Sequence, residues 1–266
     1  MKIAIIGGTG VYDPKILDNV RQQEVETPYG PVSVTSGWYQ GTEIAFMPRH
    51  GSKHSIPPHL INYRGNIWAL KKLGVEQIIA TTAVGSLNQN MKPGDFVLVD
   101  QFLDFTKGRT STFYEGGERG VVHVDVTEPY CPDLRQVLFA ASNQLGITTH
   151  NGGTYVCTEG PRFESPAEIK MFAMLHGDLV GMTNLPESVL AREAEMCYAT
   201  VSMVTNFAAG ISPHSLTHSE VVETMRANGE NLRKLIMAAI AVLASGKLTK
   251  TCHCHEALRE FGGFTL

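Results

Sequence analysis

Asn206 and His218 are two polar residues whose positions suit hydrogen bonding to a single bound ligand. Residues 198–205 form a nearly unbroken apolar and β-branched run, which predicts a strand buried on both faces that ends at Asn206. Residues 217–220 have capping-box spacing, and an amphipathic run continues to about residue 244, which predicts a helix with His218 in its first turn. Ligands of open α/β sheets bind beyond the carboxyl ends of strands, so the amide and the imidazole are expected to share one ligand there.

Three other residues are suited to binding phosphate: Thr9, Arg49 and His50. Residues 2–6 predict a buried strand that runs into Gly7-Gly8-Thr9-Gly10, where converging backbone N–H groups and the Thr9 hydroxyl can bind an anion. A tight turn accounts for these glycines equally well, and the segment matches neither the dinucleotide fingerprint nor the Walker A loop. Another predicted strand leads to Arg49 and His50, whose guanidinium and imidazole can grip phosphate oxygens.

Polar residues also follow three more predicted strands. Thr82 and Thr183 each close an apolar, β-branched run. Phe163 and Glu164 come after a third strand and combine an aromatic face with a carboxylate, although Glu164 could simply be the acid ahead of the next predicted helix. Because at least five strand ends carry such residues, we predict a parallel or mixed sheet whose rim forms a polar pocket with an anion subsite.

The elements that would position these side chains alternate along the chain. No linker, repeat or low-complexity segment divides it, so we expect one α/β domain over residues 1–266, with a mixed sheet flanked by helices and a C-terminal tail from about residue 247. Strands are predicted at 75–82, 96–100, 154–158 and 179–183, and helices at 60–73, 132–145, 166–175 and 186–196.

Composition limits the possible partners. The 266 residues are 43% hydrophobic and 18% charged, with a formal net charge of −4, so there is no basic field for nucleic acid. The N-terminal residues lack the features of a signal peptide, and no apolar stretch is long enough to cross a membrane. A cytoplasmic protein is therefore expected, with its five cysteines mostly as thiols.

A metal site is not expected from the sequence. His50, His54 and His59 have no neighbouring carboxylate or thiolate. The tail segment Cys252-His253-Cys254-His255 suggests metal binding, but zinc sites usually space their cysteines by two to four residues and need a second ligand pair elsewhere. A local Cys252–Cys254 disulfide or plain thiols are the expected states.

Several sequence segments resemble those of the trimeric nucleoside phosphorylase superfamily, and in particular those of its methylthioadenosine phosphorylase branch. They occur in the same order almost from end to end of the chain: residues 5–10, 49–51, 62–70, 81–87, 159–163, 182–183 and 186–187. The resemblance implies a single α/β domain, phosphate-dependent cleavage of an N-glycosidic bond and a homotrimer or a dimer of trimers. It implies no cofactor, because inorganic phosphate is a co-substrate.

The resemblance also implies roles for individual residues. The phosphate site would consist of Thr9, Arg49, His50, Thr82, Ala83 and Thr183. Met182 would lie against the ribose and Phe163 on the purine face. His123 matches a residue with which a neighbouring subunit closes the sugar site.

Four positions depart from the methylthioadenosine enzymes: Glu164, Asn206, Ala208 and His218. Those enzymes are similar here but have a small hydroxyl residue, two aspartates and an apolar residue, respectively. In all but Ala208, the chain instead resembles the purine nucleoside phosphorylases that act on inosine and guanosine.

Hydrogen-bond chemistry explains these differences. An ionised Glu164 can accept from the ring N1–H of a 6-oxopurine, whereas adenine presents a lone pair there. The Asn206 amide can donate to the 6-oxygen and accept from N7–H, and a neutral His218 can bond a 5'-hydroxyl. We therefore expect a 6-oxopurine nucleoside phosphorylase of purine salvage, with Asn206, Glu164 and His50 as catalytic residues.

Other functions stay open on the sequence alone. A methylthioinosine phosphorylase would share Glu164 and Asn206 but bind a thioether in the 5' pocket. A hydrolytic nucleosidase needs no phosphate site, a Rossmann-type dehydrogenase lacks its fingerprint here, and a nucleotide sensor would bind nucleoside without releasing base.

Overall fold

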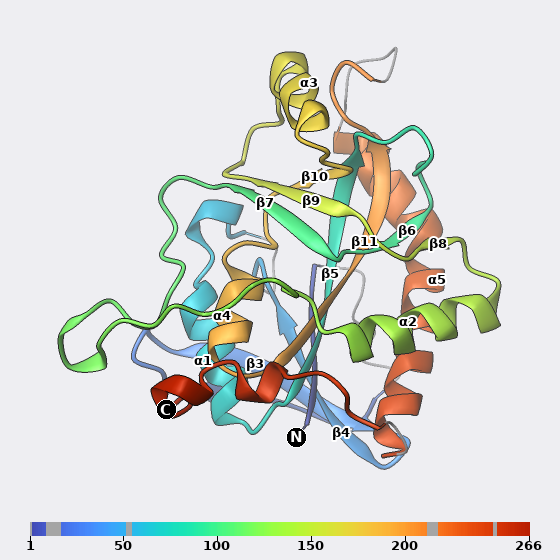
Figure 1. Cartoon of the computed structure of the whole chain (residues 1–266). Coiled ribbons are helices and arrows are strands. Elements are labelled where there is room, and N and C mark those ends of the chain that lie inside the picture. Colours follow the sequence, from blue (N-terminus) through green and yellow to red (C-terminus); the bar gives the residue numbers. More distant parts are fainter. Residues whose placement is uncertain (1, 9–16, 52–54, 212–217, 247–248) are drawn as a thin grey trace.

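The computed structural model describes residues 2–8, 17–51, 55–211, 218–246 and 249–266, apart from the side chains of His218 and Glu220. In this part of the chain, helices flank one mixed sheet of eleven strands (Figure 1), so the predicted fold class is confirmed. The strands are β1 (Ile3–Gly7), β2 (Asp18–Val25), β3 (Val32–Tyr39), β4 (Thr42–Pro48), β5 (Gln77–Ser86), β6 (Phe96–Leu98), β7 (Gln101–Phe105), β8 (Thr149–His150), β9 (Thr154–Thr158), β10 (Leu179–Gly181) and β11 (Cys197–Phe207). The helices are α1 (Tyr63–Lys72), α2 (Pro132–Leu145), α3 (Pro166–Met174), α4 (Glu187–Glu193) and α5 (His218–Ala244), with 3-10 turns η2 (Pro58–Leu60), η3 (Gly117–Arg119), η4 (Cys254–Glu256) and η5 (Arg259–Phe261).

Two long parallel strands, β5 and β11, form the centre of the sheet. As predicted, β11 is buried along most of its length, because its apolar and β-branched residues face helices on both sides. The other side of β5 changes partner partway along the strand. It pairs with β1 as far as Ala80 and with the antiparallel β10 only at Gly85 and Ser86. Between these two pairings β5 is paired with neither β1 nor β10, so a ligand site can form there.

Helices cover the two faces of the sheet in pairs. On one face α2 and α5 pack against the strands through residues such as Leu138 and Ile236. On the other face lie α1 and α4, with Trp68 and Leu190 in the core. Figure 1 shows α3 apart from both pairs, beside the ends of β9 and β10. Its Phe172 closes a smaller core there.

Most predicted elements are present, with shifted ends. The predicted helix 132–145 and strand 154–158 coincide with α2 and β9. Helix α1 begins at Tyr63 rather than at residue 60, because the Asn62 side chain caps it by accepting a hydrogen bond from Gly65 N at 3.0 Å. The prediction that a strand ends at Thr82 was wrong. The pairing with β11 extends β5 to Ser86, so Thr82 and Ala83 lie within the strand.

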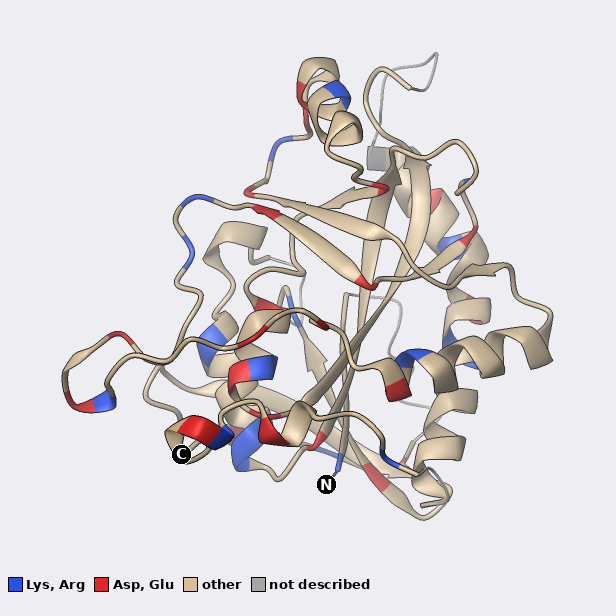
Figure 2. Cartoon of the chain, viewed as in Figure 1, with Lys and Arg blue, Asp and Glu red and all other residues tan. Residues whose placement is uncertain are grey.

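Charge is dispersed over the fold. Figure 2 shows Lys and Arg interspersed with Asp and Glu over the helices and loops seen in that view. None of the helices formed by the described residues has the length and apolar character that a bilayer span requires.

The turn between α3 and β10 offers a test of the packing. A methyl group added at Gly177 would lie 2.5 Å from Cγ2 of the buried Val156 and 3.1 Å from the Phe172 carbonyl oxygen. Gly177→Ala should lower the free energy of unfolding by about 1–3 kcal/mol, because neither neighbour can move freely. Gly108→Ala is the matched control, since nothing lies within 4 Å of its added methyl group. Urea denaturation of both variants tests the prediction, and equal losses of stability would contradict it.

Candidate active site

A pocket lies where β5 changes its partner from β1 to β10. It is lined by the middle of β5, the ends of β10 and β11, the residues after β4, the loop before α3 and one side of α5. Its lining includes Gly8, Arg49, His50, Pro58, Thr81, Thr82, Ala83, Val84, Gly85, Phe163, Glu164, Val180, Gly181, Met182, Thr183, Met203, Thr205, Asn206, Ala208, Val221, Met225 and Leu232.

Most of the predicted site residues come together in this pocket. The predicted phosphate ligands Arg49, His50, Thr82, Ala83 and Thr183 all line it, and so do the predicted nucleoside contacts Phe163, Glu164, Met182, Asn206 and Ala208. In particular, Glu164 and Asn206 border the same cavity although 42 positions separate them in the sequence. Both residues therefore border the polar pocket that was predicted at the rim of the sheet.

Three predicted residues are not placed in the pocket. Thr9 lies outside the described residues, and so does the side chain of His218, although α5 begins at that position. His123 is exposed, in the long segment between β7 and α2, and is not among the residues that line the pocket of its own chain.

Arg49 is fixed by an ion pair that the sequence did not reveal. Its Nε and Nη2 donate to the two Glu187 carboxylate oxygens at 2.7 and 2.6 Å, and its Nη1 donates to the Thr81 carbonyl at 2.9 Å. Burial opposes the charge of Arg49, but the adjacent Glu187 carboxylate outweighs it and raises the arginine pKa well above its usual range. Because a guanidinium has five N–H donors, two are left to bind an anion in the pocket.

Glu187 is itself held in place. It is fully buried in the first turn of α4, where the helix dipole favours a carboxylate, and it accepts a hydrogen bond from the Tyr198 hydroxyl at 2.8 Å. Nothing in the local pattern around Glu187 predicted this role, because its partner Arg49 is 138 positions away in the sequence.

Other hydrogen-bonding side chains, such as those of Thr82 and His50, line the pocket together with Arg49. The buried hydroxyls of Thr82 and Ser202 are 2.8 Å apart, across neighbouring strands. The His50 Nδ1 atom lies 2.9 Å from the Ile56 carbonyl oxygen, which can only accept, so Nδ1 carries a proton. One arginine, several hydroxyls and an imidazole thus line the same pocket, and this set of groups is typical of phosphate binding.

Glu164 lines the pocket from the loop before α3. Its carboxylate accepts a hydrogen bond from the Thr158 hydroxyl at 2.6 Å, and Ser165 next to it caps α3. Ser165 and Glu168 make the capping box of α3, so Glu164 directly precedes the N-cap and takes no part in that capping box. Burial raises the pKa of Glu164 above its usual value of 4.5, and the Thr158 hydrogen bond offsets part of that increase.

Asn206 owes its position to an irregularity in β11. The pairing with β5 shifts register between Val204 and Asn206, so the extra residue Thr205 forms a bulge at the pocket. The Asn206 amide accepts from the Thr205 hydroxyl at 2.7 Å and donates to the Phe207 carbonyl at 2.9 Å. The carbonyl and the amino group each keep capacity for one further hydrogen bond with a ligand.

Arg109 binds together the loops that carry the pocket residues. Its buried guanidinium donates from Nη1 to the carbonyls of Met182 and Leu185 at 2.7 and 2.6 Å. From Nη2 it donates to the carbonyls of Thr158 and Glu159 at 3.2 and 2.8 Å. The sequence did not indicate this residue.

The Arg49–Glu187 pair makes a testable prediction. Glu187→Gln should lower the free energy of unfolding by about 3–5 kcal/mol, because it leaves the buried Arg49 charge uncompensated. Chemical denaturation measures this loss. Glu230→Gln, which removes an exposed i,i+4 partner of Lys234, is the control and should leave the unfolding midpoint unchanged. An equally small effect of both substitutions would contradict the prediction.

Comparison with known proteins agrees with this geometry. The chain is 61% identical over 257 residues to the probable 6-oxopurine nucleoside phosphorylase of Moorella thermoacetica, with 97% of this chain and 98% of that protein covered. It is 52% identical over 259 residues to the probable S-methyl-5'-thioinosine phosphorylase of Methanothermobacter thermautotrophicus, with 97% and 89% covered. A methylthioadenosine phosphorylase crystal structure from an antarctic soil metagenomic library superposes with a TM-score of 0.91 at 39% identity, with 97% and 91% covered.

The family model of the phosphorylase superfamily matches residues 2–241. Since this match spans most of the chain and includes every described residue of the pocket, the protein belongs to the phosphorylase superfamily.

Proposed function

We propose that this protein is a purine nucleoside phosphorylase that acts on 6-oxopurine nucleosides such as inosine and guanosine. It would use inorganic phosphate to release the free base and form ribose 1-phosphate, a reaction of purine salvage. The observation that supports this most strongly is the presence of Glu164 and Asn206 in the same pocket as Arg49.

Arg49 and its neighbours would bind inorganic phosphate, which is the nucleophile. The two remaining N–H donors of Arg49, together with Thr82, Thr183 and His50, would hold phosphate against carbon 1' of the ribose, with Thr9 as a further ligand. As the bond to the purine breaks, the ribosyl ring becomes cation-like, and the adjacent phosphate dianion stabilises and then captures it. This mechanism relies on positioning and electrostatics, and it involves no covalent enzyme intermediate.

Glu164 and Asn206 would stabilise the leaving purine. An ionised Glu164 accepts from N1–H of hypoxanthine or guanine, whereas adenine would place a lone pair against the carboxylate. The remaining N–H of Asn206 donates to the 6-oxygen, and its carbonyl accepts from N7 as that nitrogen becomes protonated. Phe163, which is 45% exposed beside Glu164, offers a ring face for the purine, and the buried Ala208 leaves room there.

The residues expected around the ribose 5' position distinguish a phosphorylase of 6-oxopurine nucleosides from a methylthioinosine phosphorylase. Position 218 precedes Val221 and Met225, which line the pocket, by three and seven residues, so helical spacing puts it on their face of α5. His218 would hydrogen-bond the 5'-hydroxyl. The apolar residues Val221, Met225 and Leu232 nevertheless favour a thioether, so a methylthioinosine phosphorylase is the second candidate.

The exposed position of His123 supports an oligomeric enzyme. We infer that His123 completes the sugar site of a neighbouring subunit in a cytoplasmic homotrimer, or in a dimer of such trimers. An exposed histidine outside its own pocket is what such an exchange requires.

Base release tests the proposed reaction directly. Inosine, guanosine, adenosine, methylthioadenosine and methylthioinosine would each be assayed with and without phosphate. Phosphate-dependent cleavage of inosine and guanosine is expected. Release without phosphate would indicate a nucleosidase, preference for methylthioinosine would support the second candidate, and binding without release would indicate a sensor.

Substitution of Asn206 tests the base contacts. Asn206→Asp should lower kcat/KM for inosine by about 100-fold and for adenosine by far less, because a carboxylate cannot donate to a 6-oxygen but can accept from an amino group. Asn143→Asp, at an exposed position in α2, is the control for the added charge. Equal losses on both nucleosides would count against the assignment.

The raised pKa of Glu164 predicts a pH dependence. Glu164 must be ionised to accept from N1–H, so kcat/KM for inosine should fall as the pH drops through a value above 4.5. Phosphate also loses its dianion as the pH falls, but that change is common to the wild type and to Glu164→Gln. The ratio of their activities should therefore decline at low pH, and a constant ratio would refute the role of Glu164.

A further inference from the structure

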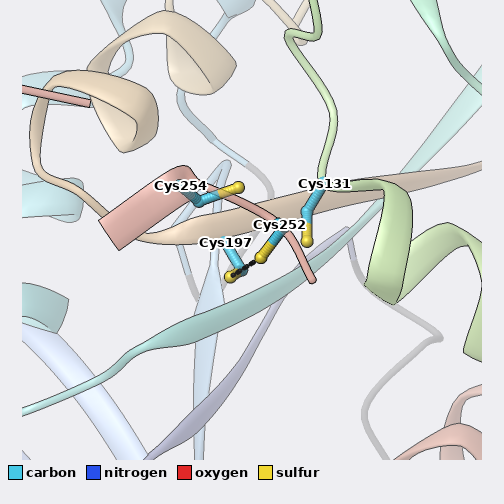
Figure 3. A group of neighbouring side chains, drawn as sticks. All are labelled: Cys131, Cys197, Cys252 and Cys254. Carbon is cyan, nitrogen blue, oxygen red and sulfur yellow. Dashed lines mark hydrogen bonds between the residues drawn. The ribbon is translucent and has the colours of Figure 1, made fainter. Parts of the chain in front are cut away.

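Four cysteines from three separate parts of the chain meet in a buried cluster, which we call the thiol cluster: Cys131, Cys197, Cys252 and Cys254. Cys131 precedes α2, Cys197 begins β11, and the other two belong to the C-terminal tail. All four sulfur atoms lie within 4.8 Å of one another. Figure 3 shows the four side chains converging and marks the contact between Cys197 and Cys252 with a dashed line. The sulfurs of these two residues are 3.6 Å apart.

The backbone holds these cysteines in place. The Cys131 N–H donates to the Tyr198 carbonyl at 2.8 Å, and the Cys197 N–H donates to the Glu76 carbonyl at 2.9 Å. The Cys252 N–H donates to the Asp133 carboxylate at 3.0 Å. The cluster is therefore preorganised by hydrogen bonds that do not involve its sulfurs.

Further contacts fix the tail on either side of the cluster. Asp133 also accepts from the backbone N–H of Thr251 at 2.8 Å. Beyond the cluster, the Glu195 carboxylate accepts from the backbone N–H groups of Leu258 and Phe264 at 3.1 and 3.0 Å. The tail is thus anchored to α2 and to the turn before β11, the elements that carry the other two cysteines.

The separations match a tetrahedral metal site. With Zn–S bonds of about 2.3 Å, tetrahedral geometry puts the sulfurs about 3.8 Å apart. The Cys197–Cys252 separation of 3.6 Å and the upper limit of 4.8 Å for all four sulfurs require only small movements of the side chains. Two disulfides would instead need two pairs at about 2.05 Å and the removal of four electrons by an oxidant.

Two basic side chains lie near the thiol cluster. Arg192 and Lys250 lie close enough to offset part of the negative charge of a metal–thiolate complex.

We propose that the thiol cluster binds one structural Zn²⁺ ion through four thiolates. Binding forms four Zn–S bonds and releases the four thiol protons to solvent, with no change of oxidation state. Thiolate ligands in a closed tetrahedral set are typical of structural zinc. Cys197 is nine residues along β11 from Asn206, about 30 Å at strand spacing, so the ion ties the tail to α2 and β11 and takes no part in the reaction.

The short Cys252-His253-Cys254 spacing made a metal site seem improbable from the sequence. The missing second ligand pair is supplied by Cys131 and Cys197, which lie 66 positions apart in the sequence and meet only through the fold.

Metal content and cobalt substitution test this proposal. The full-length protein, purified with zinc in the growth medium and washed with EDTA, should contain about one zinc per chain by plasma mass spectrometry. Replacement by Co²⁺ should give the absorption bands of tetrahedral cobalt thiolate. A mercurial reagent should release the zinc as four thiols react, a measurement that needs no variant.

Variants locate the site. Cys254→Ser and Cys197→Ser should lose most of the zinc, whereas Cys157→Ser, at the fifth cysteine and outside the cluster, should keep it. Wild-type protein that fails to bind zinc after loading would overturn the proposal, whether its cysteines prove to be free thiols or disulfides by alkylation in denaturant. Bound iron in place of zinc would overturn the assignment of the metal.

Discussion

The buried ion pair between Arg49 and Glu187 is the interaction on which the site most depends. It joins the end of β4 to the start of α4, and through Tyr198 and the Thr81 carbonyl it also reaches β11 and β5. Both side chains are almost completely buried, so neither charge is tolerable without the other. The carboxylate thus neutralises and aims the guanidinium while leaving two of its N–H groups for an anion.

A change of strand partner creates the space that this arginine faces. Between Ala80 and Gly85, β5 has β11 on one side, while on the other side β1 has ended its pairing and β10 has not begun. The bulge at Thr205 then turns the end of β11 toward the same space and delivers Asn206 there. The pocket is therefore a consequence of sheet topology, and Thr82, Ala83 and Asn206, which line it, lie on the same pair of long strands.

The loops around the pocket have little helix or strand of their own, and hydrogen bonds from Arg109 hold them in place. Four backbone carbonyls from two loops accept hydrogen bonds from its one guanidinium, which fixes the residues beside Met182 and near Glu164. At the other end of β11, the thiol cluster would likewise fix the C-terminal tail by joining it to α2. In both places a few polar groups order a segment that has little secondary structure of its own.

The sequence by itself determined the local elements and the residue types of the site. The burial of β11 and the limits of α2 and β9 follow from patterns within a few neighbouring residues. Such patterns also predicted Asn206 and the Arg49-His50 segment as polar residues at strand ends, whereas the role expected of Glu164 came from the family resemblance. Only the tertiary structure decided that β5 continues past Thr82, that Glu187 pairs with Arg49, and that Cys131 and Cys197 join the tail cysteines. Each of these depends on partners brought together from distant positions by sheet pairing and helix packing, which short-range periodicity does not encode.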